Sequence, residues 1–294
     1  MTEDQSLSGW NLSIPFITAP GLPLTETHNV MVGNRNAELQ PHAFGYSKLL
    51  IEGLDSAQSA RGLFEALRIG FLAASLNIDW GVRVRDVVAI LDQDSPMPSE
   101  VDMPLIYPTG KSLRRLLFDV GPMQMSINRI LPRIQQSLEF GIKAESAKWA
   151  TGQDRVKVAL DLYVNSYFET SESARFLALV TVLEVLKDKG DSSDNAREMI
   201  DRWSAETSKL DATEAASIRG SLKYLKWISI SRGIGSVVQR HIGDERAKEA
   251  RDLYTIRSSL MHDGIRPDNF SEIVARAQRL AKELLISILQ SGSL

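Results

Sequence analysis

Histidine is scarce in this sequence, and one of its four histidines lies close in sequence to an arginine. His262 follows Arg257 by five residues in the segment LYTIRSSLMHDG, residues 253–264. Histidine exchanges a proton near neutral pH, and arginine is a permanent cation that binds phosphate. The pair therefore suits phosphate chemistry, with a proton moved by His262 and negative charge stabilised by Arg257.

Arg257 is expected to point toward the protein interior. On a helix, Leu253 and Leu260 lie on one apolar stripe, and Arg257 lies about 40° from Leu253, at the edge of that stripe. A guanidinium facing a core cannot lose its proton, so it needs a carboxylate or a phosphate beside it. We predict that Glu184 is this partner, because residues 175–186 form a helix that is apolar on nearly every face.

His262 lies about 140° around the helix from Arg257 and roughly 7.5 Å further along it. The two side chains therefore share a pocket within one chain only if the helix loosens between them, and Asp263–Gly264 is its expected end. A structural interpretation also stays open. In it, Arg257 and Glu184 are an ion pair that joins two helices, and His262 is a C-terminal helix residue favoured by the helix dipole.

These residues resemble those of a known family. Arg257 to His262 is similar to the arginine–four residues–histidine signature of HEPN domains, and the pattern YxxRSxxxHxG over residues 254–264 resembles the ApeA-like branch. The upstream segment RFLxLxxxLE, residues 175–184, also resembles the helix that precedes the motif in that family. The likeness covers about residues 155–290. Asp263 departs from the pattern, because glycine is expected directly after the histidine.

The resemblance implies an antiparallel helical bundle, commonly a homodimer, in which two motifs meet across the interface and cleave RNA without a metal or cofactor. Enzymes of this kind serve as toxins or in defence against phage. The chemistry suits the residues, because His262 can exchange the proton and Arg257 can stabilise the charge that develops on phosphorus. Ser258 can donate a hydrogen bond to the phosphate, and Glu184 can orient Arg257. The alternative is a non-catalytic dimerisation or RNA-binding module in which the Arg–His pair is structural.

A basic and aromatic segment predicts where RNA binds. No acidic residue occurs between Glu214 and Asp244, whereas basic side chains recur there beside aromatic ones. The segment contains Arg219, Lys223, Tyr224, Lys226, Trp227, Arg232 and Arg240. We expect Lys223, Lys226 and Arg232 to contact phosphates and Trp227 to stack on a base. The alternative treats Leu222, Leu225, Trp227 and Ile228 as core residues and the lysines as solvated.

The first half of the chain, residues 1–150, is predicted to be an α+β sensor or regulatory domain. Of 11 prolines, ten lie at or before Pro132, and proline interrupts helices. Strands are expected at residues 12–16, 28–33, 46–51, 80–85 and 105–107, and helices at about 55–76 and 122–148. Pro15 suggests that the first strand lies at an edge of the sheet.

The second half, residues 151–294, is predicted to be an all-α, HEPN-like bundle. Helices are expected at residues 155–168, 172–189, 194–208, 213–229, 235–241, 245–262 and 269–290. Ser171 to Ser173, Ser193 and Asp268 are suitable N-caps, and Gly190, Gly243 and Gly264 are suitable stops.

Composition excludes several kinds of protein. The formal charge is −3, from 34 basic and 37 acidic side chains, so any contact with RNA must use a local basic surface. The absence of cysteine excludes disulfides, thiolate catalysis and iron–sulfur clusters. The start, MTEDQSLSG, is acidic and polar, unlike a signal peptide. We therefore expect a cytoplasmic protein without a membrane span.

Overall fold

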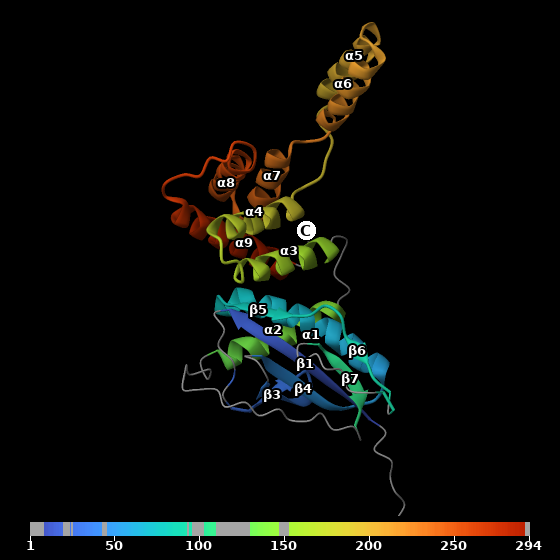
Figure 1. Ribbon diagram of the computed structural model, residues 1–294, viewed down its shortest axis with the longest axis vertical. Helices are drawn as coiled ribbons and strands as arrows, with labels where there is room; N and C mark the ends of the chain where they lie inside the picture. Colours follow the sequence, from blue (N-terminus) through green and yellow to red (C-terminus); the bar gives the residue numbers. More distant parts are fainter. Residues whose placement is uncertain are drawn as a thin grey trace, which may run out of the picture. The chain divides into compact units, whose positions relative to one another are not determined.

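The computed structural model describes residues 9–19, 24, 26–42, 46–92, 94–95, 103–109, 130–146 and 153–291. The chain divides into two compact units, a sheet unit and a helical unit (Figure 1). The sheet unit takes in residues 1–151 and 160–170, and the helical unit takes in residues 152–159 and 171–294. The predicted fold class, an α+β region followed by an all-α region, is confirmed. Residues 160–170, which we assigned to the helical half, pack instead with the sheet unit.

The sheet unit is built on a mixed sheet. Its described strands are β1 (Trp10–Ala19), β2 (His28–Val32), β3 (Arg35–Pro41), β4 (Ser47–Leu54), β5 (Gly81–Val84), β6 (Ala89–Ile90) and β7 (Leu105–Pro108). They follow the order β2-β3-β4-β1-β7-β6, and β5 also pairs with β1. Of these pairs, β6 with β7 is parallel and the rest are antiparallel.

The prediction that Pro15 marks an edge strand is wrong, because β1 is an interior strand. Along one side β1 pairs with β4, in a register that places Pro15 opposite Lys48. Along the other side β7 pairs with residues 10–13 and β5 pairs with residues 16–19. Pro15 therefore lies in the gap between two successive partners, where a residue without an N–H is tolerated.

Two helices pack together on the core of this unit. Ser56 caps α1 (Ala57–Ile78) by accepting a hydrogen bond from the amide of Ser59, at 3.0 Å. Helix α2 (Leu131–Ser146) packs closely on α1, and a Cβ atom at Gly141 would lie 2.2 Å from a carbonyl oxygen of α1. Only glycine permits this approach. The predicted helix at residues 122–148 extends beyond the described residues at both ends.

Helix α4 is the central helix of the helical unit. The helices of the second half are α3 (Gln153–Ser166), α4 (Glu172–Leu186), α5 (Asp194–Glu206), α6 (Ala212–Leu225), α7 (Ile230–Ile242), α8 (Asp244–His262) and α9 (Phe270–Ser291). Ser171 caps α4, which packs against α7, α8 and α9 and buries Phe176, Leu179 and Leu183 completely. This packing explains why α4 is apolar on nearly every face. Helix α3 is divided, because its first seven residues group with the helical unit and the rest with the sheet unit.

The predicted helices at 172–189, 213–229 and 235–241 are corrected by the structure. Helix α4 ends at Leu186, before the predicted stop at Gly190. Helix α6 ends at Leu225, and Ser229 caps α7 by accepting from the amide of Arg232, at 3.2 Å. Helix α7 therefore begins five residues earlier than expected and includes Gly233. That glycine is needed for packing, because a Cβ there would lie 2.5 Å from the carbonyl oxygen of Asp188.

Helices α5 and α6 form a hairpin that buries little of its own surface. Two antiparallel backbone segments lead into and out of it, joined by hydrogen bonds such as that from Ile228 N to Gly190 O, at 3.0 Å. The buried residues of the two helices are Ile200 and Ala215. Large apolar side chains of the hairpin are exposed, including Met199, Trp203, Ile218 and Leu225.

Candidate functional site

The predicted pairing of Arg257 with Glu184 is confirmed. Arg257 lies on α8 and Glu184 near the end of α4, and Arg257 Nε lies 3.0 Å from Glu184 Oε1. The two side chains are 24% and 18% exposed, so the pair sits in a partly dry setting at the border of the core. The two atoms are themselves buried and do not meet the geometry of a hydrogen bond, so the contact is electrostatic rather than a well-aligned bond.

Tyr254 completes the surroundings of this ion pair. It lies one turn before Arg257 on α8, and the Arg257 guanidinium carbon is 6.0 Å from the centre of its ring. Burial, with a contribution from the charge of Glu184, raises the pKa of the Tyr254 hydroxyl. The guanidinium is thus bounded by a carboxylate and an aromatic ring, which fixes its position and leaves other N–H groups for an anion.

His262 is the last residue of α8 and is exposed. The helix continues without interruption from Arg257 to His262, and Asp263 forms its C-cap, with an amide that donates to Ser259 O at 2.9 Å. The loosening that would bring the two motif side chains together in one chain does not occur. Ser258 lies directly after Arg257 and is partly buried.

Two exposed apolar residues lie close to the histidine in sequence. Met261 lies about 40° from Arg257 on the helix, between Arg257 and His262, and is 53% exposed. Ile265, just after the helix, is 59% exposed. Gly264 adopts a φ of 68° at the helix end, as expected for a glycine stop. The motif thus lies beside apolar side chains whose exposure to water is unfavourable.

Three of the four predicted RNA-binding residues lie together. Lys223, Lys226 and Trp227 line a cavity of about 630 Å³ on the hairpin, together with Arg197 and Arg219. Leu225 and Trp227 are about half exposed, so the alternative that placed both in the core is wrong. Arg232 is exposed in the first turn of α7 and does not line this cavity.

The basic side chains of this cavity differ in whether a carboxylate pairs with them. Lys226 donates to Asp201, and Arg197 donates to Asp191 at 3.1 Å. Across the described ranges, Arg219 and Lys223 take part in no ion pair. A phosphate would therefore meet these two cations first.

Sequence reasoning missed Arg155, which supports the Glu184 end of α4. Arg155 on α3 donates through Nε to Val185 O at 2.8 Å and through Nη2 to Lys187 O. These carbonyls belong to the last turn of α4 and to its C-cap, where a cation is favoured. The signal in the sequence was weak, because an arginine at the start of a helix has no distinctive pattern.

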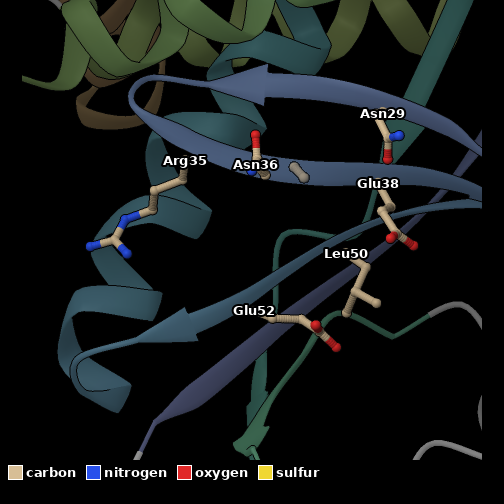
Figure 2. A pocket seen from close by; sticks show the side chains of 7 residues that line it. Asn29, Arg35, Asn36, Glu38, Leu50 and Glu52 are labelled. Atoms are coloured by element: carbon tan, nitrogen blue, oxygen red, sulfur yellow. The ribbon is translucent and has the colours of Figure 1, made fainter.

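A cavity of the sheet unit is lined mainly by amide and carboxylate side chains. It measures about 590 Å³ and lies over β2, β3 and β4, with the side chains of Asn29, Asn36, Glu38 and Glu52 around it (Figure 2). Arg35 lines it too and lies 3.5 Å from Asp55. With two carboxylates and one arginine, and with no histidine, this cavity offers no counterpart to the Arg257–His262 site.

Comparison with known proteins finds no matching family model, no similar curated protein and no similar solved structure. Within the described residues no three histidine or carboxylate side chains lie close enough together to hold a metal ion. No described helix is long and apolar enough to cross a membrane.

Replacing Glu184 tests whether the ion pair matters for the fold. Glu184→Gln is expected to lower the free energy of unfolding by about 1.5–3 kcal/mol, and Glu184→Ala by more, because each leaves the partly buried Arg257 without its counter-charge. Urea unfolding followed by circular dichroism measures the change. Glu169→Gln, at an exposed loop position, is the matched control and should change little. Unchanged unfolding in both Glu184 variants would contradict a stabilising pair.

Proposed function

We propose that the protein is a metal-independent endoribonuclease of a toxin or phage-defence system that acts in the cytoplasm through a dimeric Arg257–His262 site. The observation that carries the proposal is the Arg257–Glu184 pair, which fixes a guanidinium on the same helix as an exposed histidine. The resemblance of this motif and of the preceding helix to HEPN domains supports the same activity. The sheet unit is then the sensor or regulator.

The proposed reaction uses the RNA's own 2′-hydroxyl. His262 takes the proton of that hydroxyl, whose oxygen attacks phosphorus while the bond to the 5′-oxygen breaks. Water gives a proton to the leaving oxygen, and His262 returns its own proton to the solvent. The products are a 2′,3′-cyclic phosphate and a 5′-hydroxyl end. Arg257 stabilises the negative charge that develops on the phosphoryl oxygens, and Ser258 donates a hydrogen bond to them. DNA lacks the 2′-hydroxyl and is not a substrate.

The geometry of α8 supports a site built from two copies of the chain. Arg257 and His262 diverge by about 140° on a regular helix, so one copy does not bring both side chains onto one phosphate. Two motifs related by a two-fold axis bring an arginine and a histidine from each copy into one cleft. Met261 and Ile265, which flank His262, would become covered in such an interface.

The hairpin cavity supports contact with RNA outside the cleavage site. Arg219 and Lys223 supply cations, and Trp227 offers a ring face that is about half exposed. This combination of phosphate contacts and stacking is typical of proteins that bind single-stranded RNA.

A non-catalytic dimerisation or RNA-binding module is the second candidate. It is favoured by the same ion pair, since a guanidinium already satisfied by Glu184 needs no substrate to explain its position. The two candidates differ in whether RNA is cut.

The test is cleavage in the presence of a chelator. Purified protein should cut single-stranded RNA in EDTA and leave 2′,3′-cyclic phosphate ends, because no step of the proposed reaction needs a metal. Mass spectrometry of the fragments identifies the ends, and His262→Asn protein purified in parallel controls for contaminating nucleases. Cleavage that stops in EDTA, or no cleavage at all, would contradict the proposed enzyme.

A further inference from the structure

Three arginine side chains line one cavity of the sheet unit. The cavity measures about 490 Å³, and Arg68 from α1 lines it together with Arg83 and Arg85 from the end of β5 and the residues that follow. Its polar lining also includes Tyr46 and Asn165. This volume lies within the range of cavities that hold small molecules.

The guanidiniums of Arg83 and Arg68 are held in place by contacts within the unit. Arg83 stacks on Phe168, with its guanidinium carbon 4.3 Å from the ring centre, which leaves the N–H edge available to an oxyanion such as phosphate. Arg68 donates through Nη2 to Asp161 at 2.8 Å, and its Nε is buried without a hydrogen-bond partner among the described residues. Preorganised arginines lose little freedom when an anion binds.

The charge balance of the cavity favours an anion. Its three arginines face two carboxylates, Asp86 and Asp161. Burial is the main cause that raises the pKa of the Asp161 carboxyl, although Arg68 opposes the rise. The cavity over β2, β3 and β4 has the opposite balance, with two glutamates and one arginine (Figure 2). Of these two cavities, the one lined by Arg68, Arg83 and Arg85 is therefore the better suited to an anion.

The remaining wall of the arginine cavity is apolar. Pro15 and Ile17 of β1 and Val84 of β5 line it, beside the ring of Tyr46. An inorganic anion would leave this wall in contact with water, whereas an organic phosphate could cover it. We propose that the cavity binds a small phosphate-bearing molecule of mononucleotide size, with the phosphate on Arg83 and Arg85 and the apolar part against β1.

Helix α3 connects this ligand site to the residues that hold α4. Asp161 and Asn165 at the cavity lie on α3, and Arg155 lies about 1.7 turns before Asp161 on the same helix. Arg155 donates to the carbonyls that follow Glu184. A ligand that contacts α3 can therefore bias the position of Glu184 and, through it, of Arg257. This regulatory step rests on the proposed function, whereas binding of the ligand does not.

Isothermal titration of the full chain at low salt tests the site, with AMP, inorganic phosphate and adenosine as probes. We expect saturable binding of AMP, weaker binding of phosphate and none of adenosine. Arg83→Gln and Arg85→Gln should each weaken AMP binding by about tenfold to a hundredfold, the usual value of a charge-assisted hydrogen bond. Arg35→Gln, the same change on the same sheet, should have less than about a twofold effect.

Binding of the ligand and its effect on RNA cleavage are tested by different outcomes. Absence of AMP and phosphate binding at millimolar concentration, or equal loss in Arg35→Gln and Arg83→Gln, would overturn the site whether or not the protein cuts RNA. Tight binding of an RNA oligonucleotide that depends on Arg83 while AMP does not bind would also overturn it. AMP should change the rate of RNA cleavage in wild type and not in Arg83→Gln. An unchanged rate with AMP bound would overturn the regulatory step.

Discussion

Replacing His262 with asparagine is expected to lower RNA cleavage by about 100-fold or more, because general acid–base groups commonly contribute 100-fold to 10,000-fold to such reactions. His262 is exposed at the end of α8, so the variant should keep the melting temperature of the wild type. Loss of cleavage is then a loss of chemistry rather than of the fold. Initial rates on a labelled single-stranded RNA measure the effect.

Arg257 needs a different substitution, because it also pairs with Glu184. Arg257→Lys keeps a positive charge beside the carboxylate but removes the planar guanidinium that binds phosphate through two N–H groups. Cleavage should again fall by about 100-fold or more, while Arg279→Ala, at an exposed position of α9, should retain normal activity. Rates within about tenfold of wild type in both His262→Asn and Arg257→Lys would favour the non-catalytic module.

The ion pair was predictable from sequence because two periodic patterns fix the directions of its members. Arg257 follows Leu253 by one turn, and Leu253 is fully buried, so Arg257 points to the border of the core. Glu184 lies on α4, which is buried among three helices, so its carboxylate must find a cation. The serine caps at Ser171 and Ser193 were also predictable, because capping depends on a few neighbouring residues.

Features that depend on distant parts of the chain were not predictable. Strand β3 carries mostly polar residues, and it becomes a strand because β2 and β4 pair with it on both sides. The place of Pro15 depends on where β5 and β7 pair with β1. The arginine cavity arises from the same long-range pairing, which brings Arg83 close to Arg68 although no local pattern relates them. Local sequence patterns thus indicate where most helices lie, whereas long-range strand pairing determines which side chains share a cavity.

Mixing active and inactive protomers is expected to lower activity more than dilution alone. If a dimer forms one cleft from both motifs, one missing arginine disables the whole dimer. In an equal mixture of wild type and Arg257→Lys with free exchange, about one quarter of dimers are fully wild type, so activity should fall to about one quarter of that of an undiluted sample. Independent sites would instead give about one half. Exchange is verified by co-purification of differently tagged protomers.

A second mixture separates the arrangements that two motifs can adopt. When Arg257→Lys is mixed with His262→Asn, a single shared cleft lacks one arginine and one histidine in every heterodimer and should stay inactive. Two separate sites, each made from the arginine of one copy and the histidine of the other, would leave one site of each heterodimer intact. Activity would then return to about one quarter of the wild-type value. Such recovery, or full activity at the sedimentation mass of a monomer, would contradict the shared cleft. The regular helix between Arg257 and His262 separates them by about 140° and roughly 7.5 Å, which is why we expect both copies to contribute to one phosphate.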